Sequence, residues 1–360
     1  MTDIRIEAIS GAGGKSAACF LAVVNGARFL LDLGEGPAPG QFPDLSTVGK
    51  VDAVLVSHGH NDHIGGLNLV EQIGNPPIYA TAMTRAFAGH PALLTARELP
   101  LTGSIEIAGT TIETGRAGHA AGGVWMRLGG DAGILYTGDI CRESVLYPVD
   151  PPPRAATLIC DASYGTYDDS IDLAVTALID LARRGPLLLP LPPTGRGVEI
   201  AVLLHEAGLP IALCDKHREA VRQMIDAAPN TLVKDGATRL RAMLAAADTL
   251  DKSSPARGVM IAANAAGTAG LARDLLPSMA TNSSVTILVT GHADEETPVH
   301  TLLDSGRAQF LRWNVHPRLQ DLIWLDELAR PTHRLLAFCP SHVAAEIERQ
   351  LLAASAMRRQ

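Results

Sequence analysis

The sequence predicts an α/β fold in which stacked sheets, covered by helices, are interrupted by an inserted α/β module. The first half alternates short apolar runs with glycine-rich turns, which is typical of stacked sheets or a sandwich. Strands then alternate with helices over residues 170–308, a pattern that indicates a parallel sheet. A third observation concerns function: three histidines lie within residues 58–63, directly after an apolar run that predicts a buried strand.

The first part is expected to contain mainly strands. Its start alternates charged and apolar residues and lacks the apolar core of a signal peptide, so we interpret it as the first strand. A covering helix is predicted at 65–72, after the histidines. The further strands are predicted at residues 17–24, 28–33, 51–57, 78–79, 104–107, 111–114, 124–128, 133–137 and 157–161.

The module has its own order of elements. Helices are predicted at residues 171–184, 197–207, 217–228 and 270–279, and strands at 186–191, 211–213, 258–263 and 285–290. The chain is then expected to return to the first domain through 313–328 and 334–339. The sequence therefore predicts one domain from residues 1–169 and 309–360, and an inserted domain at 170–308.

Composition narrows the classes of function. No apolar run reaches the roughly 18 residues that a membrane span needs, so we expect no membrane partner. The five cysteines are odd in number and widely spaced, which disfavours a disulfide framework and favours the reducing cytoplasm. A net charge of −8 argues against tight, nonspecific binding of duplex nucleic acid, although residues 183–258 hold 11 Lys and Arg against 8 Asp and Glu. The sequence leaves the oligomeric state open.

The histidine cluster predicts a metal site. His58, His60, Asp62 and His63 follow the strand at 51–57 within six residues. Imidazole and carboxylate suit zinc, and also manganese or iron. Four ligand-type side chains at this spacing are rare on an ordinary solvated turn.

Three later segments each offer further ligand types. His119 lies in a glycine-rich loop, Asp139 ends the strand in YTGD, Cys339 ends the last predicted strand, and His342 follows it. Taken singly, a strand-end aspartate is most often a turn residue, and a loop histidine is usually solvated. Their order after the histidine cluster is what makes the joint signal strong.

These segments together resemble the metallo-β-lactamase fold superfamily, and Asp32 in LLDLG fits that pattern as well. The resemblance extends to the β-CASP branch, whose characterised members are largely nucleases of RNA or DNA. It implies a metallo-β-lactamase αββα sandwich with an inserted β-CASP-like domain. The matching segments are LICDASYG at 158–165, LPLPPTGRGVE at 189–199, TG at 290–291 with EET at 295–297, and NVHP at 314–317.

The resemblance also implies roles for individual residues. His58, His60 and His119 would hold one divalent ion, Asp62, His63 and a late residue would hold a second, and Asp139 would bridge the two. His342 is favoured as the late ligand, with Cys339 as the alternative. Zinc is the favoured ion for both positions. Asp62 would also orient the attacking water, and Asp161 would pair with His316, which would assist the leaving oxygen. Asp32 is expected to be a buried structural carboxylate.

A two-metal hydrolase of phosphodiester bonds, acting on single-stranded RNA or DNA, is therefore the predicted function. A hydrolase of a small phosphodiester, ester or lactone on the same scaffold is the alternative. The short module and an aromatic content of 4%, which offers little for base stacking, favour that alternative. A regulatory protein with a vestigial site is a third reading, which the complete set of ligand types disfavours.

Overall fold

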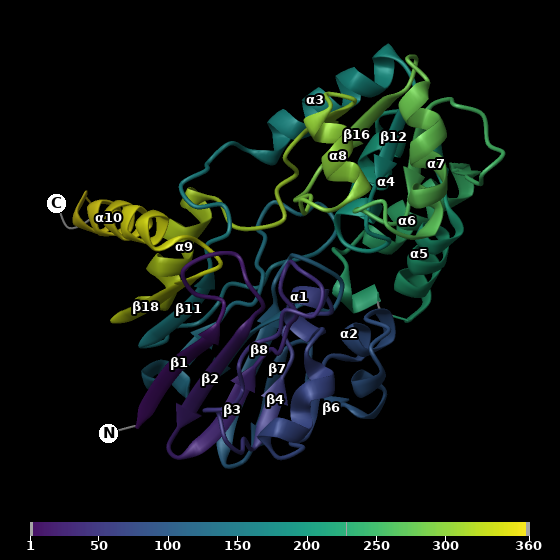
Figure 1. Cartoon of the computed structure of the whole chain (residues 1–360). Helices are drawn as coiled ribbons and strands as arrows, with labels where there is room; N and C mark the ends of the chain where they lie inside the picture. The colour runs from purple at the N-terminus through teal and green to yellow at the C-terminus, as the bar shows by residue number, and fades with distance from the viewer. Residues whose placement is uncertain (1–2, 228, 358–360) are drawn as a thin grey trace. The chain divides into compact units, whose positions relative to one another are not determined.

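The computed structural model describes residues 3–227 and 229–357, so the outermost residues of the predicted first domain and position 228 of the predicted 217–228 helix lie outside it. The chain forms two compact units, one from residues 1–168 and 315–360 and the other from 169–314. Figure 1 labels many of their helices and strands. The first unit contains the histidine cluster and is described first.

Two six-stranded sheets form the first unit, in the strand orders β1-β2-β3-β4-β5-β6 and β18-β11-β10-β9-β8-β7. The strands of the first sheet are β1 (Ile4–Ser10), β2 (Cys19–Val24), β3 (Ala27–Leu31), β4 (Ala53–Leu55), β5 (Ile78–Ala80) and β6 (Arg97–Glu98). Those of the second are β7 (Gly103–Ile107), β8 (Thr110–Arg116), β9 (Val124–Leu128), β10 (Ile134–Tyr136), β11 (Thr157–Asp161) and β18 (His333–Ala337).

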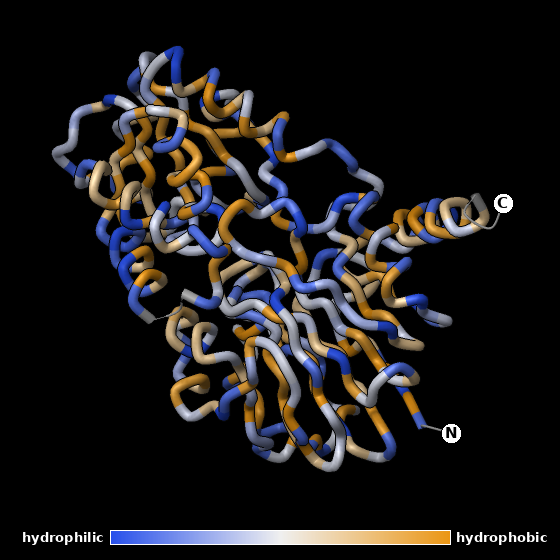
Figure 2. Tube along the Cα trace, turned by 180° about the vertical axis from the view of Figure 1, so that it is seen from behind, coloured by the Kyte–Doolittle hydropathy of each residue, from blue (hydrophilic) through white to orange (hydrophobic). Residues whose placement is uncertain are grey.

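The two sheets enclose the central core of this unit. Alternate side chains of each strand point inward, so Phe20 and Phe29 of one sheet share a cluster with Met126 and Ile159 of the other. Apolar stretches follow these strands along the trace in Figure 2. Each fully buried side chain of this size contributes roughly 1.5–3 kcal/mol by leaving water.

Helices cover the outer face of each sheet. Short helical segments, α1 (Asn61–Ile64), η1 (Leu67–Ile73), α2 (Ala82–Phe87) and η2 (Pro91–Thr95), lie beside the first sheet. Leu67 and Leu93 pack there against Leu30 and Val54. The second sheet is covered by α9 (Leu319–Ala329) and α10 (Ser341–Met357), whose apolar side chains pack on β10, β11 and β18. The predicted αββα sandwich is confirmed.

The second unit is built on one six-stranded sheet, in the order β14-β13-β15-β12-β16-β17, and its paired strands are parallel. Its strands are β12 (Leu187–Pro190), β13 (Ile211–Leu213), β14 (Asp248–Thr249), β15 (Val259–Ala262), β16 (Thr286–Val289) and β17 (Ala308–Phe310). Its helices are α3 (Ile171–Arg184), α4 (Arg196–Glu206), α5 (Asp215–Ala227), α6 (Gly236–Ala246), α7 (Gly270–Thr281) and α8 (Pro298–Asp304), with the turn η4 (Pro229–Thr231).

The chain leaves the second unit later than the sequence analysis placed it. Residues 309–314, assigned there to the first domain, lie in the second unit because β17 pairs with β16. Trp313 is buried in that unit and donates from Nε1 to Glu199, 3.2 Å away. The helix predicted over 65–72 is the 3-10 helix η1, and within the returning segment 313–328 a helix, α9, begins at Leu319.

Candidate metal centre

The histidine cluster lies in the turn between the end of β4 and the start of η1, which is hydrogen-bonded to the segment that follows β3. The turn brings the Asp62 carbonyl onto Gly34, so that a Cβ at position 34 would lie 1.7 Å from that oxygen. Gly138 allows a second close approach: its φ is +52°, and a Cβ there would lie 2.6 Å from Cβ of Ser57. Glycine at these two positions lets separate loops approach the same point.

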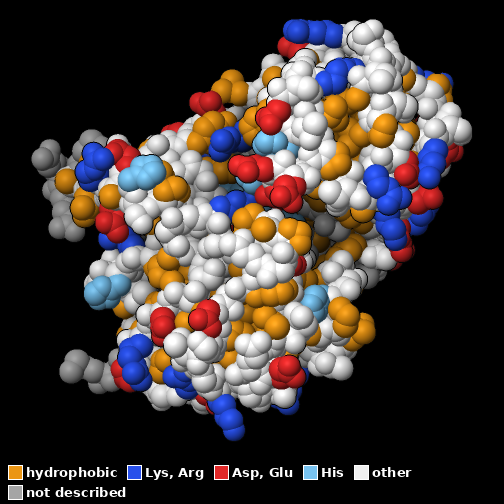
Figure 3. Space-filling model, in the orientation of Figure 1, with side chains coloured by type: hydrophobic (Ala, Val, Ile, Leu, Met, Phe, Trp, Pro, Cys, Tyr) orange, Lys and Arg blue, Asp and Glu red, His pale blue; other side chains and the backbone are white. Residues whose placement is uncertain are grey.

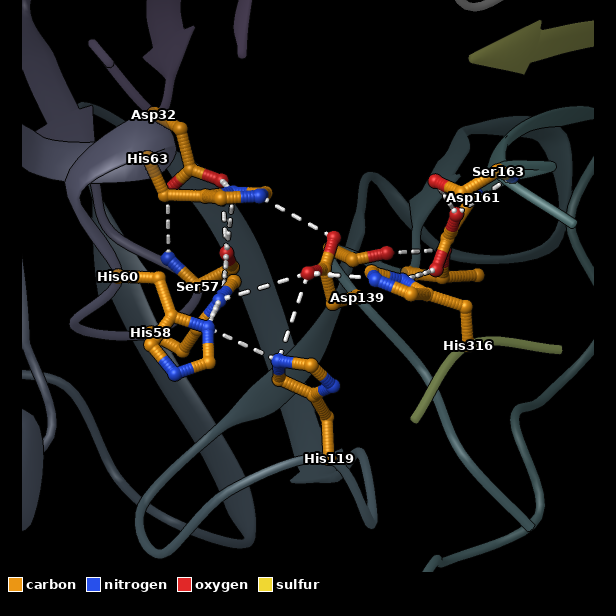
Figure 4. A network of polar contacts seen from close by, with 12 residues as sticks. Asp32, Ser57, His58, His60, His63, His119, Asp139, Asp161, Ser163 and His316 are labelled. Atoms are coloured by element: carbon orange, nitrogen blue, oxygen red, sulfur yellow. Dashed lines mark hydrogen bonds and ion pairs between the residues drawn. The ribbon is translucent and has the colours of Figure 1, made fainter. Parts of the chain in front are cut away.

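Four ligand atoms converge at this point: Nε2 of His58, Nδ1 of His60, Nε2 of His119 and a carboxylate oxygen of Asp139 (Figure 4). The His60 nitrogen is 3.0 Å from those of His58 and His119. Oδ2 of Asp139 is 3.7 Å from His58 and 3.4 Å from His119. A tetrahedral zinc with bonds of 2.0–2.1 Å would set its ligand atoms about 3.3 Å apart. The donors therefore fit one divalent ion.

Partners on the far side of each ring orient these imidazoles. Nδ1 of His119 lies 2.7 Å from the carbonyl of Val315, which can only accept, so this nitrogen carries the proton and Nε2 presents a lone pair. Ser57 Oγ donates to Asp32 and therefore accepts from Nδ1 of His58, 3.1 Å away. Two of the three imidazoles are thus held in the ligand tautomer.

Asp32 anchors the inner side of this cluster. Its fully buried carboxylate accepts from the backbone N–H and the hydroxyl of Ser57, at 2.7 and 2.6 Å. It also accepts from the Tyr136 hydroxyl at 2.6 Å and lies 2.7 Å from Nδ1 of His63. These contacts satisfy a charge that would otherwise be costly to bury, so Asp32 is the structural carboxylate that the sequence analysis expected.

Burial keeps the ligand histidines neutral. It lowers the pKa of His58 and His119, and together with the neighbouring His119 it lowers the pKa of His60 to about 3. Burial acts in the opposite direction on Asp139, but the charges of His63 and His316 outweigh it and hold the pKa of that carboxyl well below its usual range. Neutral imidazole and ionised carboxylate are the forms that bind metal.

Asp161 and His316 form a second polar group beside the first. Nδ1 of His316 lies 2.7 Å from Oδ2 of Asp161 and 3.7 Å from Oδ2 of Asp139. The other Asp161 oxygen accepts from the backbone and hydroxyl of Ser163. Burial would lower the pKa of His316, but the carboxylates of Asp161 and Asp139 raise it to about 9.

Comparison with known proteins agrees with this geometry. The model of the metallo-beta-lactamase superfamily matches residues 12–189, which include the histidine cluster, His119 and Asp139. Over these 178 of its 360 residues, the chain is similar to the metallo-β-lactamase superfamily.

Individual relatives extend the comparison. The chain is 26% identical to the transcription termination factor FttA of Methanothermobacter thermautotrophicus, over 56% of this chain and 39% of that protein. It is 27% identical to the ribonuclease TTHA0252 of Thermus thermophilus, over 57% of this chain and 56% of that protein. It is also 25% identical to the endoribonuclease YSH1 of Mycosarcoma maydis, over 84% of this chain and 41% of that protein.

The chain thus spans about 40 to 56% of the length of these relatives. Two of the three carry the name of a ribonuclease or endoribonuclease. They agree with the nuclease branch that the sequence motifs indicated.

The remaining residues implied by the superfamily resemblance lie in different surroundings. His63 lies against the bridging carboxylate, with Nε2 3.1 Å from Oδ1 of Asp139. Asp62 is half-buried on α1, where its charge partly opposes the lowering of the His60 pKa and adds to the raising of the His316 pKa. Cys339 is buried beneath α10, and burial together with the charge of Asp161 raises the pKa of its thiol to about 11. His342 is exposed in the first turn of α10.

The sequence analysis did not identify the residues that orient the ligands. Ser57 and Tyr136 reach Asp32, and Ser163 reaches Asp161. Each is adjacent or close in sequence to a named motif, but a serine or tyrosine carries no signal of its own without knowledge of which strands neighbour each other. Only the pairing of β10 with β11, and the approach of Asp32 to Ser57, brings them together.

Proposed function

We propose that this chain is a metal-dependent phosphodiesterase that cleaves single-stranded RNA, with zinc as the resident ion. The observation that carries the proposal is the convergence of three neutral imidazoles and one carboxylate beside the Asp161–His316 pair. The ribonuclease names of two relatives support RNA as the substrate class.

The donor set favours zinc, because three histidines and one carboxylate suit a borderline ion in tetrahedral geometry. Manganese and iron accept the same donors, so a metal series in the assay decides among them. A divalent ion bound there would activate water and neutralise charge on the phosphoryl group.

His316 would supply the proton to the departing oxygen. Asp161 holds Nδ1 at 2.7 Å, and the side chain is 22% exposed, so it remains reachable from solvent. The two neighbouring carboxylates keep the imidazole protonated at neutral pH. Asp161 is a positioning residue in this scheme, and Asp62, half-buried beside His63, would orient the attacking water.

A small phosphodiester, ester or lactone is the second candidate substrate. On the face seen in Figure 3, Lys and Arg side chains lie among Asp and Glu and form no continuous basic strip. That face therefore offers no strong electrostatic track for a polymer, and aromatic residues make up only 4% of the chain, which provides few stacking platforms.

The test compares substrates on one enzyme. Metal-loaded protein is incubated with labelled 5′-monophosphate RNA, single-stranded DNA and bis-p-nitrophenyl phosphate. RNA cleavage that falls at least about 100-fold in Asp139→Asn supports the proposal, since even loss of a residue that orients a ligand costs 10–100-fold. Asp226→Asn, on the exposed side of α5, is the matched control. Turnover of the small diester with no cleavage of either nucleic acid would remove the nuclease proposal.

A further inference from the structure

The two metal positions implied by the superfamily differ in the ligands that this chain provides. The first has four ligand atoms within 4.8 Å of one another, from His58, His60, His119 and Asp139. The second would use Asp62, His63 and Asp139 with one late residue. Only one contact between these donors is close, the 3.1 Å from His63 Nε2 to Asp139 Oδ1. Within the described part of the chain, no group of three or more ligand atoms this close together includes Asp62 or His63.

The late ligand is expected from the turn after β18, but the side chain of this turn that lies beside His63 is the apolar Phe338. The ring of Phe338 lies 5.7 Å from that of His63 and 6.1 Å from that of Phe20. Cys339, the next residue, is 2% exposed and packs with Ile347 and other apolar side chains beneath α10. The second position therefore faces a phenyl ring, which offers no ligand atom, where the late ligand is expected.

His342, the other candidate for the late ligand, is not gathered with the metal-ligating side chains in this structure. It follows Ser341 in the first turn of α10, and its side chain is exposed. The buried ligand groups within the described residues do not include it. Neither of the two candidates for the late ligand thus completes the second position.

Asp161 and His316 are the other potential ligands close to Asp139, but they are hydrogen-bonded to each other. Their 2.7 Å separation is a hydrogen bond and is shorter than the roughly 3.3 Å between ligands of one tetrahedral ion. The second oxygen of Asp161 is occupied by Ser163. Recruiting this pair for a metal would break three polar contacts.

We propose that this chain holds one divalent ion firmly, at His58, His60, His119 and Asp139, and a second only weakly, at Asp62, His63 and Asp139. The inference rests on the metal centre of the proposed function. Loss of an outer-shell partner already costs 10–100-fold in metal affinity, so loss of a ligand is expected to weaken the second position by roughly 100-fold or more.

Zinc stoichiometry tests this directly. The full chain is saturated with Zn²⁺, passed through a desalting column, and assayed for zinc per chain by mass spectrometry of the metal. A competition titration with a chromogenic chelator then measures the affinity of the weakly bound second zinc. We expect one retained zinc per chain and a second that binds only from excess metal.

Single-residue variants show which side chains hold each of the two zinc ions. His119→Ala should lose the firmly retained zinc, whereas Asp62→Ala, at a half-buried position, should keep it and lose the weakly bound second zinc. His63→Ala should do the same, with circular dichroism to check that the fold survives. His333→Ala, exposed at the start of β18, is the matched control and should leave the binding of both zinc ions intact.

The outcomes separate this inference from the proposed function. Two retained zinc ions per chain, or loss of the retained ion in Asp62→Ala, would overturn the unequal positions and leave the phosphodiesterase proposal standing. Retention of no ion by a folded chain would overturn both. One retained ion without RNA cleavage would support the inference and count against RNA as the substrate.

Discussion

The proposed role of His316 predicts that its loss affects substrates differently, depending on whether their leaving group needs a proton. Its Nδ1 is held by Asp161, and p-nitrophenolate departs without needing a proton. We therefore predict that His316→Gln lowers RNA cleavage by about 10²–10⁴-fold while hydrolysis of bis-p-nitrophenyl phosphate changes little. Rates on the two substrates are compared with His333→Gln as control. An equal fall on both substrates would contradict a role for His316 in protonating the leaving oxygen.

Tyr136 provides a test of the Asp32 anchor. Its buried hydroxyl donates to an ionised carboxylate at 2.6 Å, so Tyr136→Phe should lower the free energy of unfolding by about 2 kcal/mol. The imidazole ligands keep their other partners, so the retained zinc should be unchanged. Tyr79→Phe removes a hydroxyl that accepts from the exposed Arg97 and should cost less. Urea denaturation measures both, and equal costs would argue against the anchor.

Candidate ligands that the structure gathers together could be named from sequence where a motif places them close along the chain. His58, His60 and His63 are within six residues, and their order before His119 and Asp139 carries the signal. The late ligand could not be predicted in this way. Whether Phe338, Cys339 or His342 faces the metal depends on where the left-handed turn at Phe338, with φ of 62°, directs each side chain.

At the level of elements, the contact between Gly34 and α1 fixes where the metal-binding turn lies. A Cβ at position 34 would meet the Asp62 carbonyl at 1.7 Å, and that carbonyl also accepts from the N–H of Ala18. Gly34→Ala should therefore cost at least about 1–3 kcal/mol and reduce retained zinc. Gly14→Ala, with nothing within 4 Å, is the control. Unchanged denaturation and zinc content in Gly34→Ala would contradict this packing.

The carboxyl ends of β12, β13 and β15 meet at a buried His217. Its Nε2 donates to the Pro192 carbonyl at 3.0 Å, and its Nδ1 accepts from the Cys214 thiol at 3.2 Å. Cys214 also accepts from the N–H of Ala263. These contacts tie three strand ends together around a neutral imidazole, since burial lowers the pKa of His217 to about 4.

This low pKa makes the second unit sensitive to acid. In the unfolded chain His217 has a pKa near 6.5 and is protonated below that pH, whereas in the folded chain it stays neutral down to about pH 4. The free energy of unfolding therefore falls as the pH drops from 6.5 to 4. The loss attributable to His217 should approach about 3 kcal/mol at pH 4. His217→Gln should lose less stability than the natural chain between pH 7 and 4, measured by urea denaturation. Parallel losses would contradict the assignment.

Elements with a strong local pattern were predicted with accurate bounds, and weak ones were missed. The predicted helix at 171–184 and strand at 211–213 coincide with α3 and β13. Ser170 caps α3 by accepting from the N–H of Asp172, and Arg183 and Arg184 lie in its last turn, where positive charge is favourable. The edge strand β17 has two exposed residues out of three and no apolar run, so its pairing with β16 could not be foreseen.

At the level of the molecule, the sequence could predict two units because the change from clustered strands to alternating strands and helices is visible in the pattern. The exact return point depends on β17, which only the sheet of the second unit defines. No helix among the described residues has the length and apolar character needed to cross a membrane.

The central claim is that His58, His60, His119 and Asp139 hold a metal ion. Anomalous diffraction at the zinc absorption edge, on crystals of the zinc-loaded chain, tests it most directly. The account predicts a strong peak within about 2.0–2.2 Å of the three imidazole nitrogens and the carboxylate oxygen. Absence of a peak there, or a strong peak at other residues with these four side chains unbound, would contradict it.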